Sequence, residues 1–121
     1  MPLTVISRLE DNFAVLELSG SLTLGPTLNT LRDTTRQVLS TNKLSGIILQ
    51  MGGITVTDSS GLGELTVVYT LATNRKCPIR LAMVSSSLKK MLEMTRIDEL
   101  LPACPDIATA KSDLRQRAAT A

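Results

Sequence analysis

The sequence predicts a single α/β domain in which about four helices pack on one mixed, mostly parallel sheet of about four or five strands. Three observations support this fold class. Leu44–Met51 and Ile79–Val84 are apolar runs of strand length, typical of central strands covered on both faces. Segments with helical apolar spacing separate these runs. The chain begins with two alternating segments joined by Asp11-Asn12, which indicates a β-hairpin.

The N-terminal hairpin and the first helix follow from turn and capping signals. Apolar residues alternate with polar ones from Leu3 to Leu9, a second strand covers Phe13 to Leu18, and Gly20 closes it. Gly25-Pro26 then opens a helix, because proline fits the first helical turn, and Asn42-Lys43 ends it. We expect one face of this helix to be buried through Leu28, Leu31, Val38 and Leu39.

The third strand and the second helix meet at a polar junction. Gly52-Gly53 breaks the apolar run of the strand, and Ile54 to Thr57 leads onward. A helix starts at Ser59 with Asp58 as its N-cap. Its apolar stripe is expected to comprise Leu62, Leu65, Val68 and Ala72.

The C-terminal part adds a strand, two helices and a short edge strand. Pro78 ends the second helix, and Ser85-Ser86-Ser87 caps the third. The inner stripe of this third helix is expected to be Leu88, Met91, Leu92 and Thr95. An edge strand is predicted around Asp106-Ile107-Ala108, followed by a helix from about Ala110 to Arg117. The order is therefore strand-strand-helix-strand-helix-strand-helix-strand-helix. The domain covers residues 3–117, and residues 118–121 form a frayed tail.

Composition removes several classes of function. Phe13 and Tyr69 are the only aromatic residues, so no stacking platform for nucleic acid is expected. The net charge is +2, from 13 basic and 11 acidic residues mixed along the chain, which argues against a nucleic-acid partner. No apolar run reaches the roughly 18 residues that a membrane span needs. The start has no signal-peptide pattern, and we expect a cytoplasmic protein without membrane contact.

The chain has no histidine, which removes the commonest general base and metal ligand. Cys77 and Cys104 lie 27 positions apart without a CxxC spacing, so they are expected to be reduced structural thiols. We therefore expect no enzyme activity, no cofactor and no metal.

The most informative segment is Thr57 to Gly63, where hydroxyls and a carboxylate meet a helix start. Free backbone N–H groups and the positive end of the helix dipole suit a phosphate there. The serines could cap the helix, attack an acyl group, or accept a phosphoryl group. An acyl-transfer serine would need a histidine base and a GxSxG elbow, and the chain has neither. Gly61-Leu62-Gly63 lacks the other residues of a phosphate-binding loop. A phosphoserine beside Asp58 would build up negative charge without unfolding the domain.

At this point the chain resembles the STAS domain of bacterial anti-sigma factor antagonists over residues 3 to 117. The resemblance rests on the string Asp58-Ser59-Ser60-Gly61-Leu62-Gly63 after an apolar strand, on Leu18 to Leu22, and on the Leu88 to Ile97 pattern. It implies that Ser59 is phosphorylated, and that the unmodified protein binds an anti-sigma factor that is also a serine kinase. A PP2C-type phosphatase would reset it.

The resemblance also implies a partner-binding face. That face would comprise Asp58, Ser59, Ser60, Gly61, Leu62 and Gly63, together with the neighbouring loop around Gly20 to Gly25, including Ser21 and Thr23. It implies a regulatory binding protein in transcription that acts by partner switching, as a monomer or weak dimer. Two alternatives stay open. One is a STAS module that is never phosphorylated and serves as a scaffold or ligand sensor. The other is a receiver-like domain with Asp58 as the phosphoacceptor.

Overall fold

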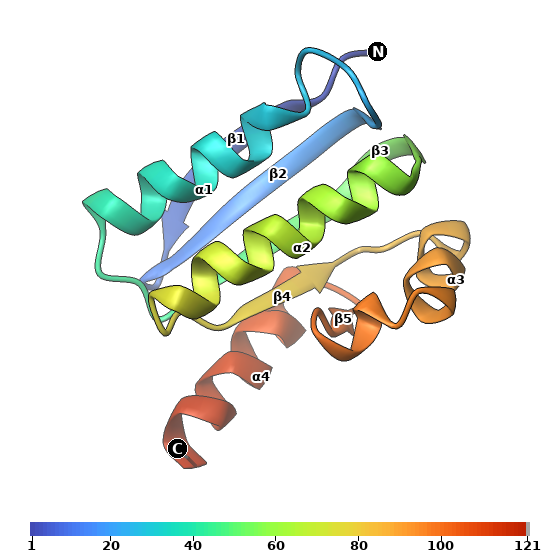
Figure 1. Ribbon diagram of the computed structural model, residues 1–121. Helices are drawn as coiled ribbons and strands as arrows, with labels where there is room; N and C mark the ends of the chain where they lie inside the picture. Colours follow the sequence, from blue (N-terminus) through green and yellow to red (C-terminus); the bar gives the residue numbers. More distant parts are fainter. Residues whose placement is uncertain (121) are drawn as a thin grey trace.

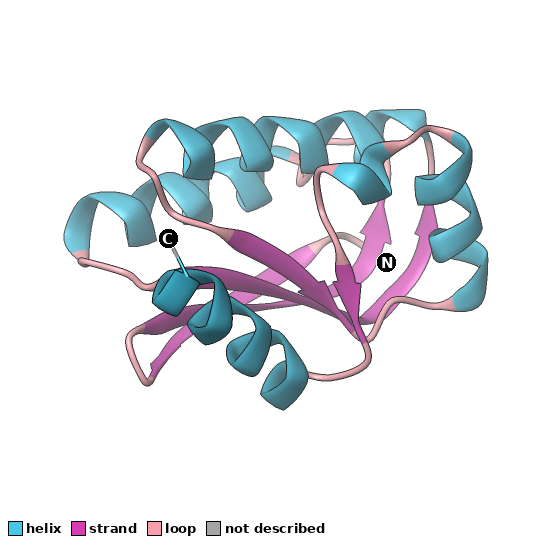
Figure 2. Cartoon of the chain, turned by 90° about the horizontal axis from the view of Figure 1, so that it is seen from below, coloured by secondary structure: helices cyan, strands magenta, loops and turns pink. Residues whose placement is uncertain are grey.

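The computed structural model describes residues 1–120, with side chains through residue 116. One five-stranded sheet has the order β1-β2-β3-β4-β5, in which β1 is antiparallel to β2 and the other neighbours are parallel. The helices α1, α2 and α3 cover one face of the sheet and α4 lies on the other (Figures 1 and 2). The elements are β1 (Thr4–Glu10), β2 (Phe13–Leu22), α1 (Asn29–Thr41), β3 (Gly46–Thr57), α2 (Ser59–Asn74), β4 (Ile79–Ala82), α3 (Ser86–Met94), the 3-10 helix η1 (Ile97–Glu99), β5 (Ala103–Cys104) and α4 (Ile107–Thr120). The predicted fold class and element order are confirmed.

The central strands β2 and β3 separate two apolar layers. Ile47 and Leu49 belong to the larger layer under α1, α2 and α3, whereas Ile48 between them belongs to the smaller layer under α4. Both faces of this part of β3 are therefore buried, which explains its unbroken apolar run. The smaller layer is made of Phe13, Val15, Ile48, Ala82, Ala110 and Leu114.

The predicted hairpin and helix faces are confirmed, except for Thr95, which follows α3 as its C-cap and is exposed. Asp11 and Asn12 have φ values of 54° and 68°, as a two-residue type I′ turn requires. All four residues predicted for the inner face of α1 are buried, and so are all four predicted for α2. On α3, Leu88 and Leu92 are buried, while Met91 is half-buried against the core and Thr95 is exposed.

Two glycine positions were wrongly predicted to end or break strands. The second strand continues past Gly20 to Leu22, and β3 runs through Gly52-Gly53 without interruption. The register between β2 and β3 shifts twice, which lets both strands continue as irregular pairs. Gly20 has a φ of +92°, and a Cβ on it would lie 2.2 Å from the Pro2 carbonyl oxygen, so glycine is required there by contact and conformation.

The start of the first helix and the end of the fourth strand were also misplaced. Residues 26–28 form turns and α1 begins at Asn29, because the Leu28 N–H donates to the Gly25 oxygen in a tighter turn. The predicted strand Ile79–Val84 ends at Ala82, where Met83 adopts a positive φ of 59°. Met83 therefore leaves the extended conformation that a strand needs.

The predicted edge strand at Asp106-Ile107-Ala108 is wrong. The edge strand is β5, and α4 begins at Ile107 because the Asp106 carboxylate accepts a hydrogen bond from the Thr109 N–H at 2.7 Å. The helix continues to Thr120, beyond the predicted end at Arg117. The predicted frayed tail, residues 118–121, lies where side chains are not described, and residue 121 lies outside the described residues. Among the described residues, no helix is long and apolar enough to cross a membrane.

Candidate functional site

The candidate site lies where β2 and β3 end together and α2 begins. Leu22 and Thr57 are the last paired residues of the two strands. The Asp58 N–H then donates to the Leu22 carbonyl at 3.3 Å, and Ser59 opens α2. The parallel strands thus deliver the helix start to one edge of the sheet (Figure 1).

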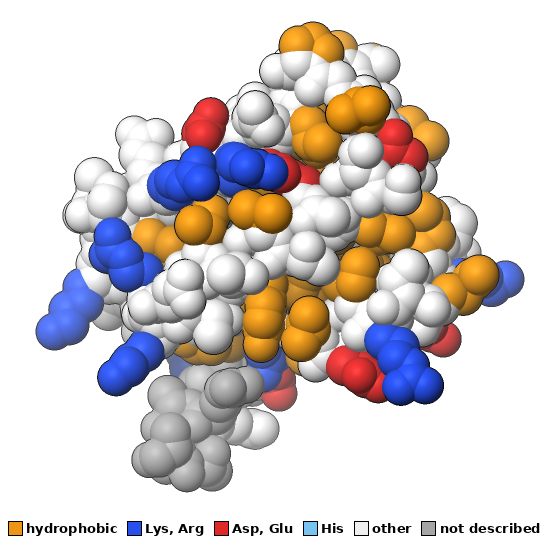
Figure 3. All heavy atoms as spheres, in the orientation of Figure 1, with side chains coloured by type: hydrophobic (Ala, Val, Ile, Leu, Met, Phe, Trp, Pro, Cys, Tyr) orange, Lys and Arg blue, Asp and Glu red, His pale blue; other side chains and the backbone are white. Residues whose placement is uncertain are grey.

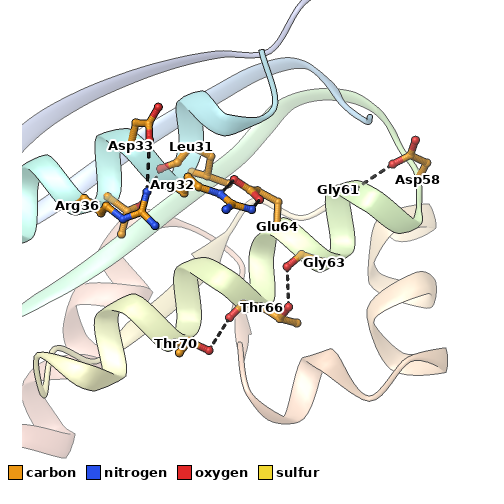
Figure 4. A network of polar contacts seen from close by, with 11 residues as sticks. Leu31, Arg32, Asp33, Arg36, Asp58, Gly61, Gly63, Glu64, Thr66 and Thr70 are labelled. Carbon is orange, nitrogen blue, oxygen red and sulfur yellow. Dashed lines mark hydrogen bonds and ion pairs between the residues drawn. The ribbon is translucent and has the colours of Figure 1, made fainter. Parts of the chain in front are cut away.

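The Asp58 carboxylate ties two segments together. Its Oδ1 accepts a hydrogen bond from the Gly61 N–H at 2.9 Å (Figure 4). This bond caps the N-terminus of α2, as predicted. Its Oδ2 accepts from the Leu24 N–H at 3.1 Å, in the loop after β2. These donated hydrogen bonds hold the pKa of the Asp58 carboxyl below its usual value. Both oxygens of this carboxylate are therefore engaged in the fold.

The glycine and leucine of the motif serve packing. A Cβ on Gly61 would lie 1.9 Å from the Leu22 carbonyl oxygen, so no other residue fits between α2 and the end of β2. Leu62 is buried in the core. Gly63, in contrast, is exposed, and nothing lies within 4 Å of a Cβ placed on it.

The remaining predicted site residues reach the surface. Ser59 is exposed on the first turn of α2, where helix N–H groups have no intrahelical partner. Ser60, Ser21 and Thr23 are half-buried. Two exposed apolar side chains accompany them: Leu24, 77% exposed, and Val56, 52% exposed and paired in register with Ser21. We call this surface the Ser59 face: Ser21, Thr23, Leu24, Val56, Ser59, Ser60 and Gly63.

Sequence reasoning missed Val56 and an ion pair behind the face. Glu64 is only 2% exposed, and it accepts from Arg32 Nε at 2.8 Å and Arg32 Nη2 at 2.5 Å. This two-pronged pair joins α2 to α1 (Figure 4). Nothing in the local sequence shows that an arginine 32 positions away meets Glu64.

Two other features limit the chemistry of the molecule. Burial raises the pKa of the Cys77 thiol to about 11, and Cys104 is also free, with its pKa raised mainly by burial. Neither thiol is activated as a nucleophile. Among the described residues, no group of three Cys, Asp or Glu side chains could hold a metal ion.

The topology excludes a receiver-like fold. A receiver of the flavodoxin-like type has the strand order 2-1-3-4-5, whereas this sheet has the order 1-2-3-4-5 with an antiparallel first pair. The acidic pair Glu10-Asp11 lies at the hairpin turn, where Lys111 contacts it. Asp58 is at the other end of β3 and is occupied as a cap.

The basic side chains form no stripe on the face that carries α1 and α2. Figure 3 shows most of them toward the left of the view, among neutral and hydrophobic side chains. This distribution differs from the clustered basic surface of nucleic-acid-binding domains.

Comparisons with known proteins agree with the fold. A family model for the STAS domain matches residues 5–110. Among solved structures, an anti-sigma factor antagonist from Mycobacterium paratuberculosis is 16% identical, with a TM-score of 0.76 over 93% of this chain and 94% of that one. No curated protein matches the chain.

Two further solved structures have a similar fold. The Bacillus cell fate determinant SpoIIAA in its phosphorylated form is 14% identical, with a TM-score of 0.67 over 91% of this chain and 97% of that one. The STAS domain of a SulP transporter from Vibrio cholerae is 18% identical, with a TM-score of 0.69 over 94% and 89% of the two chains. At these identities the likeness is one of fold.

Proposed function

The chain belongs to the STAS domain family, and on that premise we propose that it is an anti-sigma factor antagonist controlled by phosphorylation of Ser59. In the unphosphorylated state the Ser59 face binds an anti-sigma factor that is also a serine kinase. Phosphorylation releases the partner, and a PP2C-type phosphatase restores binding. The protein is thus a non-enzymatic regulator of transcription in the bacterial cytoplasm.

The proposal rests on one observation: some residues of the motif are needed for the fold, whereas Ser59 is free at the surface. Asp58, Gly61 and Leu62 are committed to the cap, to a close contact with β2 and to the core. Ser59 alone combines an exposed hydroxyl with a position on the first turn of α2. A phosphate there meets free N–H groups and the positive end of the helix dipole, so the fold tolerates it.

Charge and bulk explain how the phosphate would release a partner. The depressed pKa of Asp58 keeps that carboxylate ionised at neutral pH, and the phosphate adds about −1.5 to −2 of charge beside it. The exposed Leu24 and Val56 suit an apolar contact with the partner, and a phosphate between flush surfaces would have to be desolvated. The solved phosphorylated form of SpoIIAA, a protein of the same fold, supports a phosphorylated state compatible with that fold.

Affinity for the cognate anti-sigma factor tests the switch. We expect Ser59→Asp to weaken binding at least about tenfold, corresponding to about 1.4 kcal/mol, while Ser59→Ala binds like the wild type. The matched control is Thr109→Asp, because Thr109 is an exposed residue in the first turn of α4, close to the capping Asp106, on the opposite face of the sheet. Equal affinity of Ser59→Asp, Ser59→Ala and wild type would reject the switch.

A second function is a STAS module that is never phosphorylated and acts as a scaffold or ligand sensor. The likeness in fold to a transporter's STAS domain favours considering it. The intact mass of the protein from its native host, sampled in growth and under stress, separates the two functions. An unmodified mass in every condition would favour the scaffold or sensor.

A further inference from the structure

A groove lies near the C-terminal end of α2, between that helix and the segment that leads from η1 to β5. It has a volume of about 600 Å³. Tyr69 lines it from α2, Leu100 and Pro102 line it from the segment before β5, and β4 contributes Ile79 and Arg80. In Figure 1, β4 runs between these two parts of the chain. A groove of this size has room for a small molecule.

The groove contains a short length of open strand edge. The N–H groups of Leu81 and Met83 donate to Pro102 and Cys104 on the β5 side, and hydrogen bonding alternates along a strand, so the N–H of Ile79 points to that side as well. β5 pairs only with the last two residues of β4. Within the described part of the chain the Ile79 N–H therefore has no acceptor, although the residue is only 3% exposed. An acceptor that enters the groove would satisfy it.

Arg80 adds further donors beside this N–H. Its side chain is 9% exposed. Its Nε donates to Asp113 Oδ2 of α4 at 2.6 Å, and its Nη1 donates to the Ile79 carbonyl oxygen at 2.8 Å, which holds the guanidinium against the strand edge. A guanidinium carries five N–H groups, and Nη2 donates to none of the residues whose side chains the structure describes. The groove is thus lined by two residues that have donors to spare.

Around these donors the groove is apolar and its charges balance. Asp113 neutralises Arg80, and the exposed Lys76 and Glu99 are of opposite sign. Leu100 is 42% exposed, so an apolar ligand would remove it from water. These features favour a ligand in which an oxygen acceptor ends an apolar chain.

The open edge is too short for an added polypeptide strand. Pro78 faces β3, because its carbonyl accepts from the Ile47 N–H, and Arg80 follows with the same orientation. β5 then pairs with the strand from Leu81 onward. Ile79 is therefore the one residue of β4 whose backbone is open on this side, whereas strand addition uses a series of alternate residues.

We propose that this groove binds a small molecule whose apolar chain ends in a carbonyl or carboxyl oxygen, and that this oxygen accepts from the Ile79 N–H and from Arg80 Nη2. The apolar chain lies along Tyr69, Leu100 and Pro102. The groove is near the C-terminal end of α2, whereas Ser59 opens that helix, so the ligand and a protein partner occupy different ends of it. The inference is therefore independent of the Ser59 switch.

The fluorescence of Tyr69 tests binding directly. Tyr69 is the single tyrosine and the chain has no tryptophan, so its emission reports on the groove. The full chain is titrated with octanamide, octanoate and octylammonium, which share an apolar chain. We expect a saturable change with octanamide or octanoate, and the tighter of the two shows whether the preferred oxygen is neutral or ionised. Octylammonium has no acceptor and should cause no change. No saturable change with either acyl probe, or an equal response to octylammonium, overturns the proposal.

Two matched variants of α2 test the place of binding. Thr73→Phe fills the groove and should abolish binding of the acyl probe, followed by amide shifts in ¹H–¹⁵N spectra. Thr70→Phe is the control: Thr70 is also exposed, its hydroxyl also donates to the carbonyl four residues earlier, and it lies outside the groove lining. Equal binding by these two variants contradicts the site.

A third variant tests the donors. Arg80→Lys keeps the charge but removes the Nη groups, and we expect it to weaken binding of the acyl probe about tenfold. Its dispersed ¹H–¹⁵N spectrum serves as the check that it folds, and an unchanged affinity in the folded variant would reject the role of Arg80. Failure of these tests leaves the Ser59 switch unaffected, since that switch is measured by partner affinity.

Discussion

At the hairpin end of β2 the chain is held by ion pairs, whereas at its Leu22 end it is held by one carboxylate that binds backbone N–H groups. The hairpin end gathers charge from β1, the turn and α4. Lys111 contacts Glu10 and Asp11, Arg115 contacts Asp11 at 3.5 Å and lies over the Phe13 ring, and Arg8 joins Glu10 to Glu17. At the other end, the Asp58 carboxylate connects α2 to the loop after β2.

This difference shows why the Ser59 end suits a switch. A charge added to the hairpin end would enter an existing network of opposite charges and be compensated there. A phosphate on Ser59 meets one ionised carboxylate and exposed apolar side chains, so it changes the local charge strongly. The structural contacts beneath it are backbone-directed or apolar, and we expect them to persist after modification.

The largest effect on stability is expected from a methyl group at the Leu22 end. Gly61→Ala would place its Cβ 1.9 Å from a backbone carbonyl oxygen, so α2 and β2 must move apart. We expect a loss of about 3 kcal/mol or more in unfolding free energy, measured by urea denaturation. Gly63→Ala, two residues on and open to solvent, is the matched control and should gain about 0.5–1 kcal/mol. Equal effects of both changes would refute the contact.

The ion pair behind the Ser59 face should respond asymmetrically. Arg32→Ala leaves the buried Glu64 carboxylate without its partner, so we expect it to lower the melting temperature by several degrees. Glu64→Leu removes the buried charge itself and should cost less, because an apolar side chain of similar size suits that environment. Thermal melts of the two variants decide this, and a costlier Glu64→Leu would contradict it.

Weakening the hydrogen bonds of the Asp58 carboxylate should loosen the loop after β2 more than it destabilises the fold. Asp58→Asn weakens the hydrogen bonds to Gly61 and Leu24, so we expect a modest fall in melting temperature and faster hydrogen exchange of both N–H groups. Asp106→Asn removes the corresponding charged cap of α4 and serves as the control. Unchanged exchange at the Leu24 N–H in Asp58→Asn would show that the loop is held by other contacts.

The ion pairs at the hairpin end of β2 should make the free energy of unfolding depend on pH in the acid range. Hydrogen bonds from Arg8 and Lys111 lower the pKa of Glu10 from 4.5 to about 2. Between these values the unfolded chain binds more protons than the folded one, so this contribution is present above pH 4.5 and is lost as pH falls toward 2. Glu10→Gln should flatten this part of the stability curve. The lowered pKa of Asp58 acts in the same direction, so some slope should remain.

Urea midpoints of Glu10→Gln and wild type, taken across this pH range at low and high salt, measure the difference. Added salt should reduce it, because the network is partly exposed. Parallel curves for the two proteins would show that the hairpin ion pairs contribute nothing to the folded state.

Contacts between neighbours in the chain could be predicted from the sequence, whereas contacts between distant segments could not. The Asp58 cap and the Asp11-Asn12 turn depend on neighbours in the chain, so local residue types indicate them. The Glu64 pair with Arg32 depends on how two helices meet, and the hydrogen bond from the Leu24 N–H to Asp58 depends on where the end of a distant strand lies. No local pattern reports such contacts.

The errors have an equally local cause. Gly52-Gly53 predicted a break because glycine disfavours strands in isolation, yet pairing with the irregular half of β2 keeps β3 continuous. At residues 106–108 a short edge strand was predicted where α4 begins. Asp106, a residue type that favours the N-cap position, was the signal for the start of α4.

Phosphosite mapping of the protein purified from its native host, in growth and under stress, is the most direct test of phosphorylation at Ser59. We expect one phosphoryl group on Ser59 that survives hydroxylamine, in a protein whose melting temperature matches that of the unmodified form. A hydroxylamine-labile phosphate on Asp58, a phosphate on another residue, or an unmodified chain in every condition would contradict it.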